Sequence, residues 1–293
     1  MTKVPVRSHL RRAPKKPKEP SLARLTITKK RFREFNEENG GLGEMDVGRK
    51  WVFVRVPGAG GGGGPGERLG DDDLEYVIGA DTIRENAMDN LDDLLGFDVV
   101  PPTYIRATDI PAQDLFGNRD TDLPGTIAVS VQDKVPDAIE FNSVMDMASR
   151  DVGKTFEWDS KAKPNEELLN ALYEYANKDD IVKIAVLDII SRNTDRHGGN
   201  FLVQESTRRV YAIDHELTFD AEPQNQRGLR SLPAKFVQGE KIPDKILAAM
   251  REVQKGDFYA ALAGIPEDNI EAAWDRKMKL QKAERFPRYT GWN

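Results

Sequence analysis

Apolar and polar residues follow a strand-like pattern in the first half of the chain. β-Branched and aromatic residues dominate residues 50–56 and 99–107, and residues 125–135 alternate apolar with polar side chains, so each predicts a β-strand. Over residues 81–97 the apolar positions instead recur every three to four residues and end at Gly96, which predicts a helix. One helix among these strands predicts a small, mostly antiparallel α+β lobe.

The pattern changes at about residue 137, where helical spacing takes over. Between the helices, residues 200–204 and 210–214 have the composition of two short strands joined by a turn, which predicts a hairpin. The second lobe is therefore expected to be mainly helical, with this hairpin embedded in it. The expected helices cover residues 165–177, 179–193, 243–254 and 266–286, with a further helical turn over 256–264.

Length and composition fit this division into two lobes. The chain has 293 residues, of which 39% are hydrophobic and 31% charged, as is usual for a soluble globular protein. We expect residues 25–136 to form the first lobe and residues 137–293 the second. Within the first, residues 57–73 contain five consecutive glycines between prolines and predict a flexible loop. Phosphate-binding loops instead alternate glycine with residues that fix the turn.

Residues 1–24 form a strongly basic tail. They hold eight Lys and Arg residues and one glutamate, a charge of +7, which leaves 35 basic and 48 acidic residues, or −13, in the rest of the chain. An acidic body is a poor general nucleic-acid binder. The tail is compatible with a disordered solubilising extension. It is also compatible with docking on nucleic acid, anionic lipid or an acidic partner.

Composition also excludes several kinds of site. The chain has no cysteine, and therefore no disulfide, thiolate metal site or cysteine nucleophile. No window approaches eighteen consecutive apolar residues, and the N-terminus lacks the apolar region of a secretory signal. We expect a cytoplasmic protein without a transmembrane segment.

An unusual concentration of polar residues, SRNTDRHGGNFLV, occupies residues 191–203, directly after an apolar helical run. Asp195 is followed five residues later by Asn200, and Asp214 ends the second strand of the predicted hairpin. Phosphoryl transfer from a nucleotide uses such a set: one carboxylate orients the acceptor, while a second carboxylate and a carboxamide hold Mg²⁺ against the phosphates. Oxygen ligands of this kind suit Mg²⁺. The order of helix, loop, hairpin and acid therefore predicts a kinase-like site.

Each of these residues also has a purely structural interpretation. An aspartate in a loop or at a strand end often caps a turn, and Arg196 is suitably placed to pair with Asp188 on the preceding helix. His215 is expected to be structural. His197 is a candidate for contact with the metal-side loop, although a lone histidine makes no zinc site.

LDIISRNTDRHGGNFLV followed by VYAIDHELTF resembles the catalytic core of the phosphatidylinositol 3-/4-kinase-like superfamily. The likeness is greatest to type II phosphatidylinositol 4-kinases and their bacterial relatives, and more distant to HipA-type kinases. It implies an α+β, two-lobed protein-kinase-like fold that binds ATP and Mg²⁺. The residues it implies are the catalytic-loop Asp195, Arg196 and His197, the metal-binding Asn200 and Asp214, and the helix glutamate Glu85.

One position departs from the family pattern. The family carries a lysine in the strand before the helix, where it contacts the nucleotide phosphates and pairs with the helix glutamate. Here that position is Val54, with Arg55 next to it. Because neighbours in a strand face opposite ways, Arg55 takes over only if a bulge or register shift turns it inward. Arginine binds phosphate but is not interchangeable with lysine.

Our leading hypothesis is an ATP-dependent phosphotransferase in which Glu85 positions a basic residue, Arg55, on the phosphates. Type II lipid kinases commonly use a cysteine-rich palmitoylated segment, which a cysteine-free chain lacks, so a protein or small-molecule acceptor is favoured over a lipid. The displaced basic residue also supports a pseudokinase or nucleotide-sensing module. A third hypothesis is a structural or assembly protein that binds a partner through its basic tail. The same residues are also chemically compatible with transfer of a nucleotide, instead of a phosphate, to a protein side chain.

Overall fold

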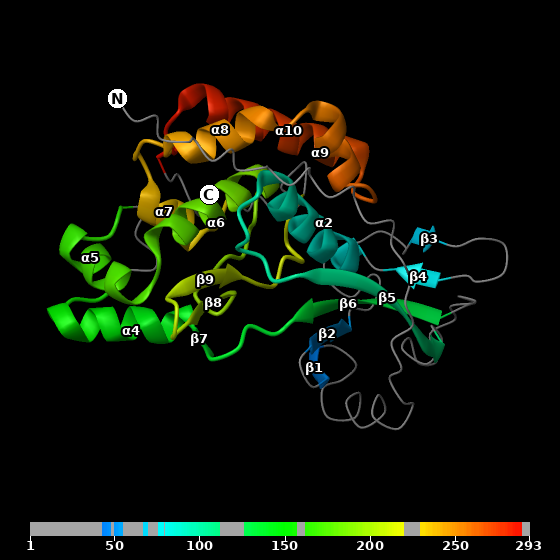
Figure 1. Ribbon diagram of the computed structural model, residues 1–293, viewed down its shortest axis with the longest axis horizontal. Coiled ribbons are helices and arrows are strands. Elements are labelled where there is room, and N and C mark those ends of the chain that lie inside the picture. The colour runs from blue at the N-terminus through cyan, green and yellow to red at the C-terminus, as the bar shows by residue number, and fades with distance from the viewer. Residues whose placement is uncertain are drawn as a thin grey trace, which may run out of the picture.

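The computed structural model describes most of the chain from residue 80 onward, together with four short strands before it (Figure 1). The basic tail of residues 1–24, Arg55 and the glycines at 60–64 lie outside the described residues. The described ranges are 43–47, 50–54, 67–69, 76–78, 80–111, 126–156, 162–219 and 229–288.

The first sheet is built around β6 (Thr126–Asp133). β5 (Thr103–Pro111) runs antiparallel along one side of β6. On the other side, β2 (Lys50–Val54) pairs with its second half and β4 (Tyr76–Ile78) with its first half. All pairings except that of β4 with β6 are antiparallel, which confirms the mostly antiparallel first lobe. The remaining strands, β1 (Gly43–Val47) and β3 (Glu67–Leu69), extend the two ends.

β3 corrects one expectation. Residues 67–69 belong to the segment 57–73 that was expected to be a flexible loop, but they form a strand antiparallel to β4. The β-prone sequence Tyr-Val-Ile of β4 supplies a partner whose backbone groups satisfy those of β3. A loop is therefore the wrong prediction for these three residues.

Helix α2 (Ala80–Leu95) packs against β5 and β6. Its buried side chains, which include Ile83, Ala87 and Leu91, follow the predicted spacing, and Gly96 ends the helix with a φ of +66°. Asp92 is also buried, and its Oδ2 accepts the backbone N–H groups of Val99 and Val100, at 3.0 and 3.2 Å. These two hydrogen bonds fix the turn that follows the helix.

A second, smaller sheet contains the predicted hairpin. β8 (Phe201–Gln204) and β9 (Arg209–Ala212) pair antiparallel with Gln204 opposite Arg209, which confirms the hairpin. β7 (Ala138–Glu140), which was not predicted, adds a third strand on the other side of β8.

The rest of the described chain is helical, and α6 (Lys178–Ser191) lies at its centre. Ten of the fourteen residues of α6 are buried, including Asp180 and Asp188, because α7, α10 and β9 pack around it. The four predicted helices and the additional helical turn are present. The helices besides α6 are α4 (Phe141–Val152), α5 (Glu166–Tyr175), α7 (Leu232–Val237), α8 (Asp244–Glu252), α9 (Lys255–Ala261) and α10 (Glu267–Ala283).

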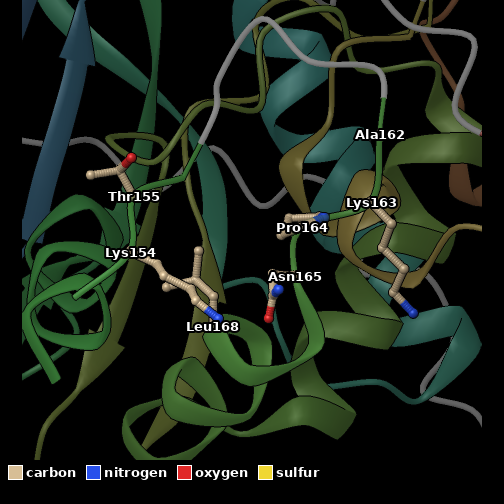
Figure 2. Close-up of a pocket in the computed structure, with 7 residues that line it drawn as sticks. All are labelled: Lys154, Thr155, Ala162, Lys163, Pro164, Asn165 and Leu168. Carbon is tan, nitrogen blue, oxygen red and sulfur yellow. The ribbon is translucent and has the colours of Figure 1, made fainter. Parts of the chain in front are cut away.

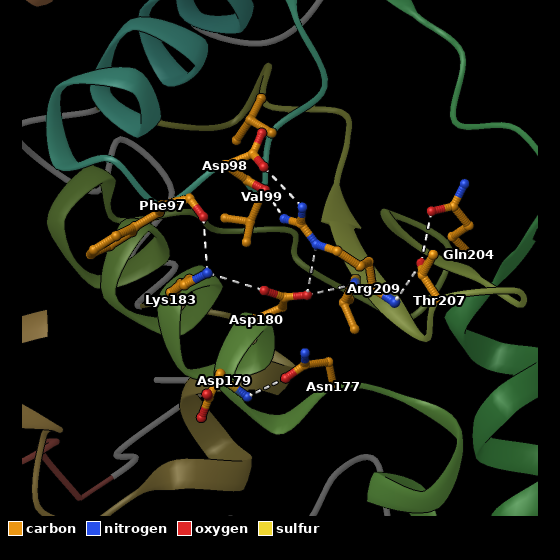
Figure 3. Close-up of polar contacts among 12 residues, drawn as sticks. Phe97, Asp98, Val99, Asn177, Asp179, Asp180, Lys183, Gln204, Thr207 and Arg209 are labelled. Carbon is orange, nitrogen blue, oxygen red and sulfur yellow. Dashed lines mark hydrogen bonds and ion pairs between the residues drawn. The ribbon is translucent and has the colours of Figure 1, made fainter. Parts of the chain in front are cut away.

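Polar contacts join the turn after α2 to the helical part (Figure 3). Arg209 on β9 donates to the Asp98 carboxylate at 2.9 Å and to Asp180 at 3.3 Å, and also bonds the Asp98 carbonyl. Lys183 on α6 donates to the Phe97 carbonyl at 3.0 Å. The end of α2 is thereby fastened to α6 and to the hairpin.

The expected fold class is confirmed: the chain is α+β, with a small sheet region and a mainly helical region as in a two-lobed kinase. Figure 1 shows the first sheet with α2 on one side of the molecule and α4 and α5 on the other, with the second sheet between them. Within the part of the chain that the structure describes, no helix has both the length and the apolar character needed to cross a membrane.

Candidate active site

The loop between α6 and β8 holds Asp195 by its backbone. Asn193, which is buried, accepts the Asp195 N–H through its side-chain oxygen at 2.8 Å. Asn200 donates from its side-chain nitrogen to the Asp195 carbonyl at 2.9 Å. The side chain of Asp195 itself keeps 42% of its surface exposed. The loop therefore presents one carboxylate on a backbone fixed from both sides.

His197 lies beside that carboxylate. Its Nε2 is 3.9 Å from Asp195 Oδ2, and its Nδ1 accepts the Gly199 N–H at 3.1 Å. Since a backbone N–H occupies Nδ1, the proton of the neutral ring lies on Nε2 and faces Asp195. The imidazole is 54% exposed, so an acceptor can reach both side chains.

The hairpin brings the two predicted metal ligands together. Asn200 immediately precedes β8 and Asp214 follows β9, and the Ile213 N–H donates to the Asn200 carbonyl at 3.0 Å. Because the Asn200 nitrogen bonds Asp195, its side-chain oxygen is the atom available to a cation. Asp214 is partly exposed and has a φ of +56°, a left-handed conformation that Asp tolerates better than most residues.

This donor set suits magnesium. In the described residues no three His, Cys, Asp or Glu side chains cluster as a metal site would require. One carboxylate and one carboxamide nevertheless fit Mg²⁺, which usually keeps several waters and binds substrate phosphates instead of a complete protein cage.

Arg196 is buried beneath the loop, not exposed on it. Its side chain is fully buried and its Nε bonds Asp188 on α6 at 3.2 Å, which confirms the expected ion pair. Its Nη1 donates to the carbonyls of Asn200, at 2.6 Å, and Ile213, and its Nη2 lies 2.7 Å from His215 Nδ1. One guanidinium thus connects α6, the loop and the segment that carries Asp214.

Residues 229–232 hold the other side of the loop. The Arg196 N–H donates to the Arg230 carbonyl at 2.8 Å, and the Arg230 N–H donates to the Asn193 carbonyl at 3.0 Å. Ser231 donates from Oγ to Asp188 Oδ2 at 2.7 Å and caps α7. Burial raises the pKa of Asp188 above its ordinary value, although Arg196 and Ser231 act in the opposite direction.

His215 is buried, as a structural role requires. Burial, and then the charge of Arg196, hold the pKa of the His215 imidazole well below its usual value. Its ring is therefore neutral, and Nδ1 accepts from Arg196. Its backbone N–H donates to Glu85 Oε1 at 2.5 Å, which connects α2 to the residue next to Asp214.

Gly198 lets the loop approach α4. The Asn142 N–H donates to the Gly198 carbonyl at 3.1 Å, and a Cβ added at Gly198 would lie 2.2 Å from Asn142 Oδ1. A larger residue fits only if the Asn142 side chain, α4 or the loop moves.

Six of the seven predicted site residues lie in this region, and the seventh, Arg55, is outside the described residues. Asp195, His197 and Asp214 are partly or largely exposed, whereas Asn200, Arg196 and Glu85 are buried. Sequence reasoning did not identify Asn193, Ser231 or Asn142. Only Asn193, two residues before Asp195, carried a local signal, because asparagine often accepts the N–H two residues ahead.

A cavity of about 420 Å³ opens between the end of α4 and the start of α5 (Figure 2). It contains none of the predicted site residues. Its two lysines are already paired, Lys154 with Glu167 and Lys163 with Glu240 at 2.5 Å. The lining residues are Lys154, Thr155, Ala162, Lys163, Pro164, Asn165 and Leu168.

Comparison with known proteins agrees with this site. Residues 113–254, which span the loop and the hairpin, match the family described as phosphatidylinositol 3- and 4-kinase. No curated protein matches the chain.

Similar solved structures are kinases of low identity. The Helicobacter pylori proinflammatory kinase CtkA is 14% identical, with 78% of this chain and 92% of that one covered and a TM-score of 0.42. The Golgi casein kinase with Mn/ADP bound is 16% identical, with 87% and 76% covered and a TM-score of 0.47. The structure of hydra Fam20 with sugar is 14% identical, with 82% of this chain and 79% of that one covered and a TM-score of 0.45.

The family match includes Asp195, Asn200 and Asp214, the residues from which the resemblance was inferred. That resemblance is therefore confirmed over residues 113–254, which match the phosphatidylinositol 3- and 4-kinase family.

Proposed function

We propose that this protein is an ATP-dependent phosphotransferase. The observation that carries the proposal is the hairpin geometry, which holds Asn200 and Asp214 together beside the exposed carboxylate of Asp195. Such a set supports phosphoryl transfer, in which positioning and charge stabilisation provide most of the catalysis.

The residues divide into distinct roles. Asp195 orients the acceptor hydroxyl and takes up its proton, and His197 lies close enough to assist it. Asn200 and Asp214 would hold Mg²⁺, which supplies charge neutralisation for the phosphates when it is bound. Arg196 acts as a positioning residue, because its buried guanidinium holds the backbone on both sides of the site.

The acceptor in this proposal is a protein or a small molecule, not a lipid. The absence of cysteine supports it, because a palmitoylated anchor segment requires cysteine. The acidic charge of the chain outside its first 24 residues supports it as well, since an anionic membrane surface repels such a body.

Asp214→Asn tests the proposal. The variant keeps the size and tolerates the left-handed φ, but removes the charge that would bind the metal. Transfer of the γ-phosphate from Mg·ATP, to water or to the protein itself, should be abolished. Asp98→Asn is the matched control, because Asp98 has a φ of +57° and lies outside the site. Unchanged turnover in Asp214→Asn would contradict the assignment.

A pseudokinase is the second candidate, and one observation favours it. β2 ends at Val54, where the superfamily carries its phosphate-binding lysine. This candidate predicts that Mg·ATP raises the melting temperature of the wild-type protein although no phosphate is released. Thermal-shift and phosphate-release measurements on the same sample distinguish it from an active kinase.

A further inference from the structure

Arg276 on α10 carries a positive charge that is largely buried. α10 packs on α6 (Figure 1), and Arg276 Nε donates to the carbonyl of Ile190, in the last turn of α6, at 2.8 Å. Its Nη2 is buried and has no hydrogen-bond partner among the described residues. No carboxylate in the described part of the chain forms an ion pair with Arg276, although the exposed Asp275 is its neighbour in sequence. Because buried charges in proteins are normally paired, Arg276 has both a donor group and a charge to offer.

A second cation lies beside Arg276. Arg192 directly follows α6, two residues after Ile190, and its backbone N–H donates to the carbonyl of Asp188. Burial, and then the charge of Arg192, lower the pKa of Arg276 to about 10, so Arg276 is still charged at neutral pH. The C-terminal end of α6 offsets part of this repulsion, since a helix C-terminus is equivalent to about half a negative charge. A net positive charge remains at the end of α6.

The residue between Ile190 and Arg192 also has an unused polar group. Ser191 is fully buried, and its Oγ has no hydrogen-bond partner within the described ranges, whereas its carbonyl accepts the Phe219 N–H at 2.6 Å. Arg192 and Arg276 are each only partly buried, so their side chains border on solvent. Two positive charges, an unused guanidinium N–H and contact with solvent favour an anion with several oxygens as the ligand.

We propose that Arg192 and Arg276 form a binding site for a phosphate group. A phosphate with two negative charges balances two arginines, and its oxygens match the guanidinium fork, which binds phosphate bidentately. A carboxylate brings only one charge. The site is separate from Asn200 and Asp214 and does not depend on the proposed function. It lies at the start of the loop that carries Asp195, so a bound phosphate would stabilise the end of α6 from which that loop begins.

Equilibrium dialysis of the full chain against radiolabelled inorganic phosphate tests the site. EDTA is included so that no metal at Asp214 recruits phosphate. We expect the wild type to bind phosphate and Arg276→Met to bind it at least roughly 10-fold more weakly, because hydrogen bonds from a charged donor are among the strongest in proteins. Arg251→Gln is the matched control. Arg251 is an exposed arginine that pairs with Glu284 at 2.5 Å, so its replacement should leave phosphate affinity unchanged.

Arg192→Asn provides a second variant in case Arg276→Met does not fold. Asparagine tolerates the φ of +55° at this position, so the change removes the charge and keeps the backbone. It should also weaken phosphate binding roughly 10-fold. Melting temperatures give an independent measurement: phosphate should raise that of the wild type above its value in chloride at equal ionic strength, and acetate should not. Both variants should lose this difference.

Unlabelled competitors distinguish two sources of the phosphate group. Displacement of the label by inorganic phosphate alone indicates the free ion, and displacement by O-phosphoserine as well indicates a phosphomonoester; both results support the site. A wild-type protein that binds no phosphate overturns the inference. So does wild-type phosphate affinity in Arg276→Met or Arg192→Asn, or an acetate effect on the melting temperature as large as that of phosphate.

Discussion

Replacing Arg196 with lysine tests how far the loop that carries Asp195 and the segment that carries Asp214 depend on one buried guanidinium. The wild-type side chain reaches Asp188, the carbonyls of Asn200 and Ile213, and His215 at the same time. A lysine keeps the positive charge, but its ammonium is a single point and cannot span acceptors that surround a planar fork. The variant therefore isolates geometry from charge.

The structure sets the size of the effect. Breaking a buried ion pair costs about 3–5 kcal/mol when one partner is removed, and each buried acceptor left unsatisfied costs about 1–3 kcal/mol. Lysine retains the charge and can satisfy one or two of the four acceptors. We therefore expect Arg196→Lys to lower the free energy of unfolding by about 3 kcal/mol, which corresponds to two abandoned acceptors.

Urea denaturation followed by circular dichroism measures this loss, with Arg209→Lys as the matched control. Arg209 also contacts several oxygens, but its side chain is 28% exposed, so water can replace the lost contacts. The control should lose no more than about 1 kcal/mol. If Arg196→Lys is as stable as Arg209→Lys, the buried guanidinium does not hold the loops together.

Two further predictions concern Gly198 and Asp92. Gly198→Ala should lower the free energy of unfolding by about 1–3 kcal/mol, because the new methyl group overlaps the Asn142 side chain. The control Gly256→Ala, in open space on α9, should raise it by up to about 1 kcal/mol. Thermal melts of the two variants and the wild type measure the difference. Burial raises the pKa of Asp92 to about 8. The unfolded carboxyl loses its proton first, so wild-type stability should fall as pH rises from about 4 to about 8, by several kcal/mol. Asp92→Asn should remove this fall in urea titrations at pH 5.5 and 8.5, and a slope that persists would contradict the assignment.

Much of the fold could be predicted because apolar spacing reflects which face is buried. α2, α6 and the hairpin carry strong patterns, and each formed where the spacing placed it. α4 has a regular buried set that includes Phe141 and Val144, but the sequence changes character there and the set was not recognised. α7 has six residues and begins beside a proline, which is too short for periodicity to appear.

The site was predicted to the extent that it is local in sequence. Asp195 and Asn200 are five residues apart, and together with the helix before them and the hairpin and Asp214 after them this spacing suggested a shared task. The contact of Glu85 with His215 joins residues 130 positions apart, and that of Ser231 with Asp188 spans 43. Neither has a local pattern, since only tertiary packing brings residues so far apart in sequence into contact. The sequence therefore indicated Asp195, Asn200 and Asp214, but only part of the buried set that holds their backbone.

The buried contacts determine the charge of the site. Arg196 and Asp188 neutralise each other inside the fold. His215 adds no charge, because its Nδ1 accepts from Arg196 and its remaining proton faces the Ala212 carbonyl. The carboxylates of Asp195 and Asp214, in contrast, are partly exposed. Two negative groups repel a nucleotide triphosphate, so the proposed phosphotransferase would need a divalent cation held at Asp214 to offset this repulsion.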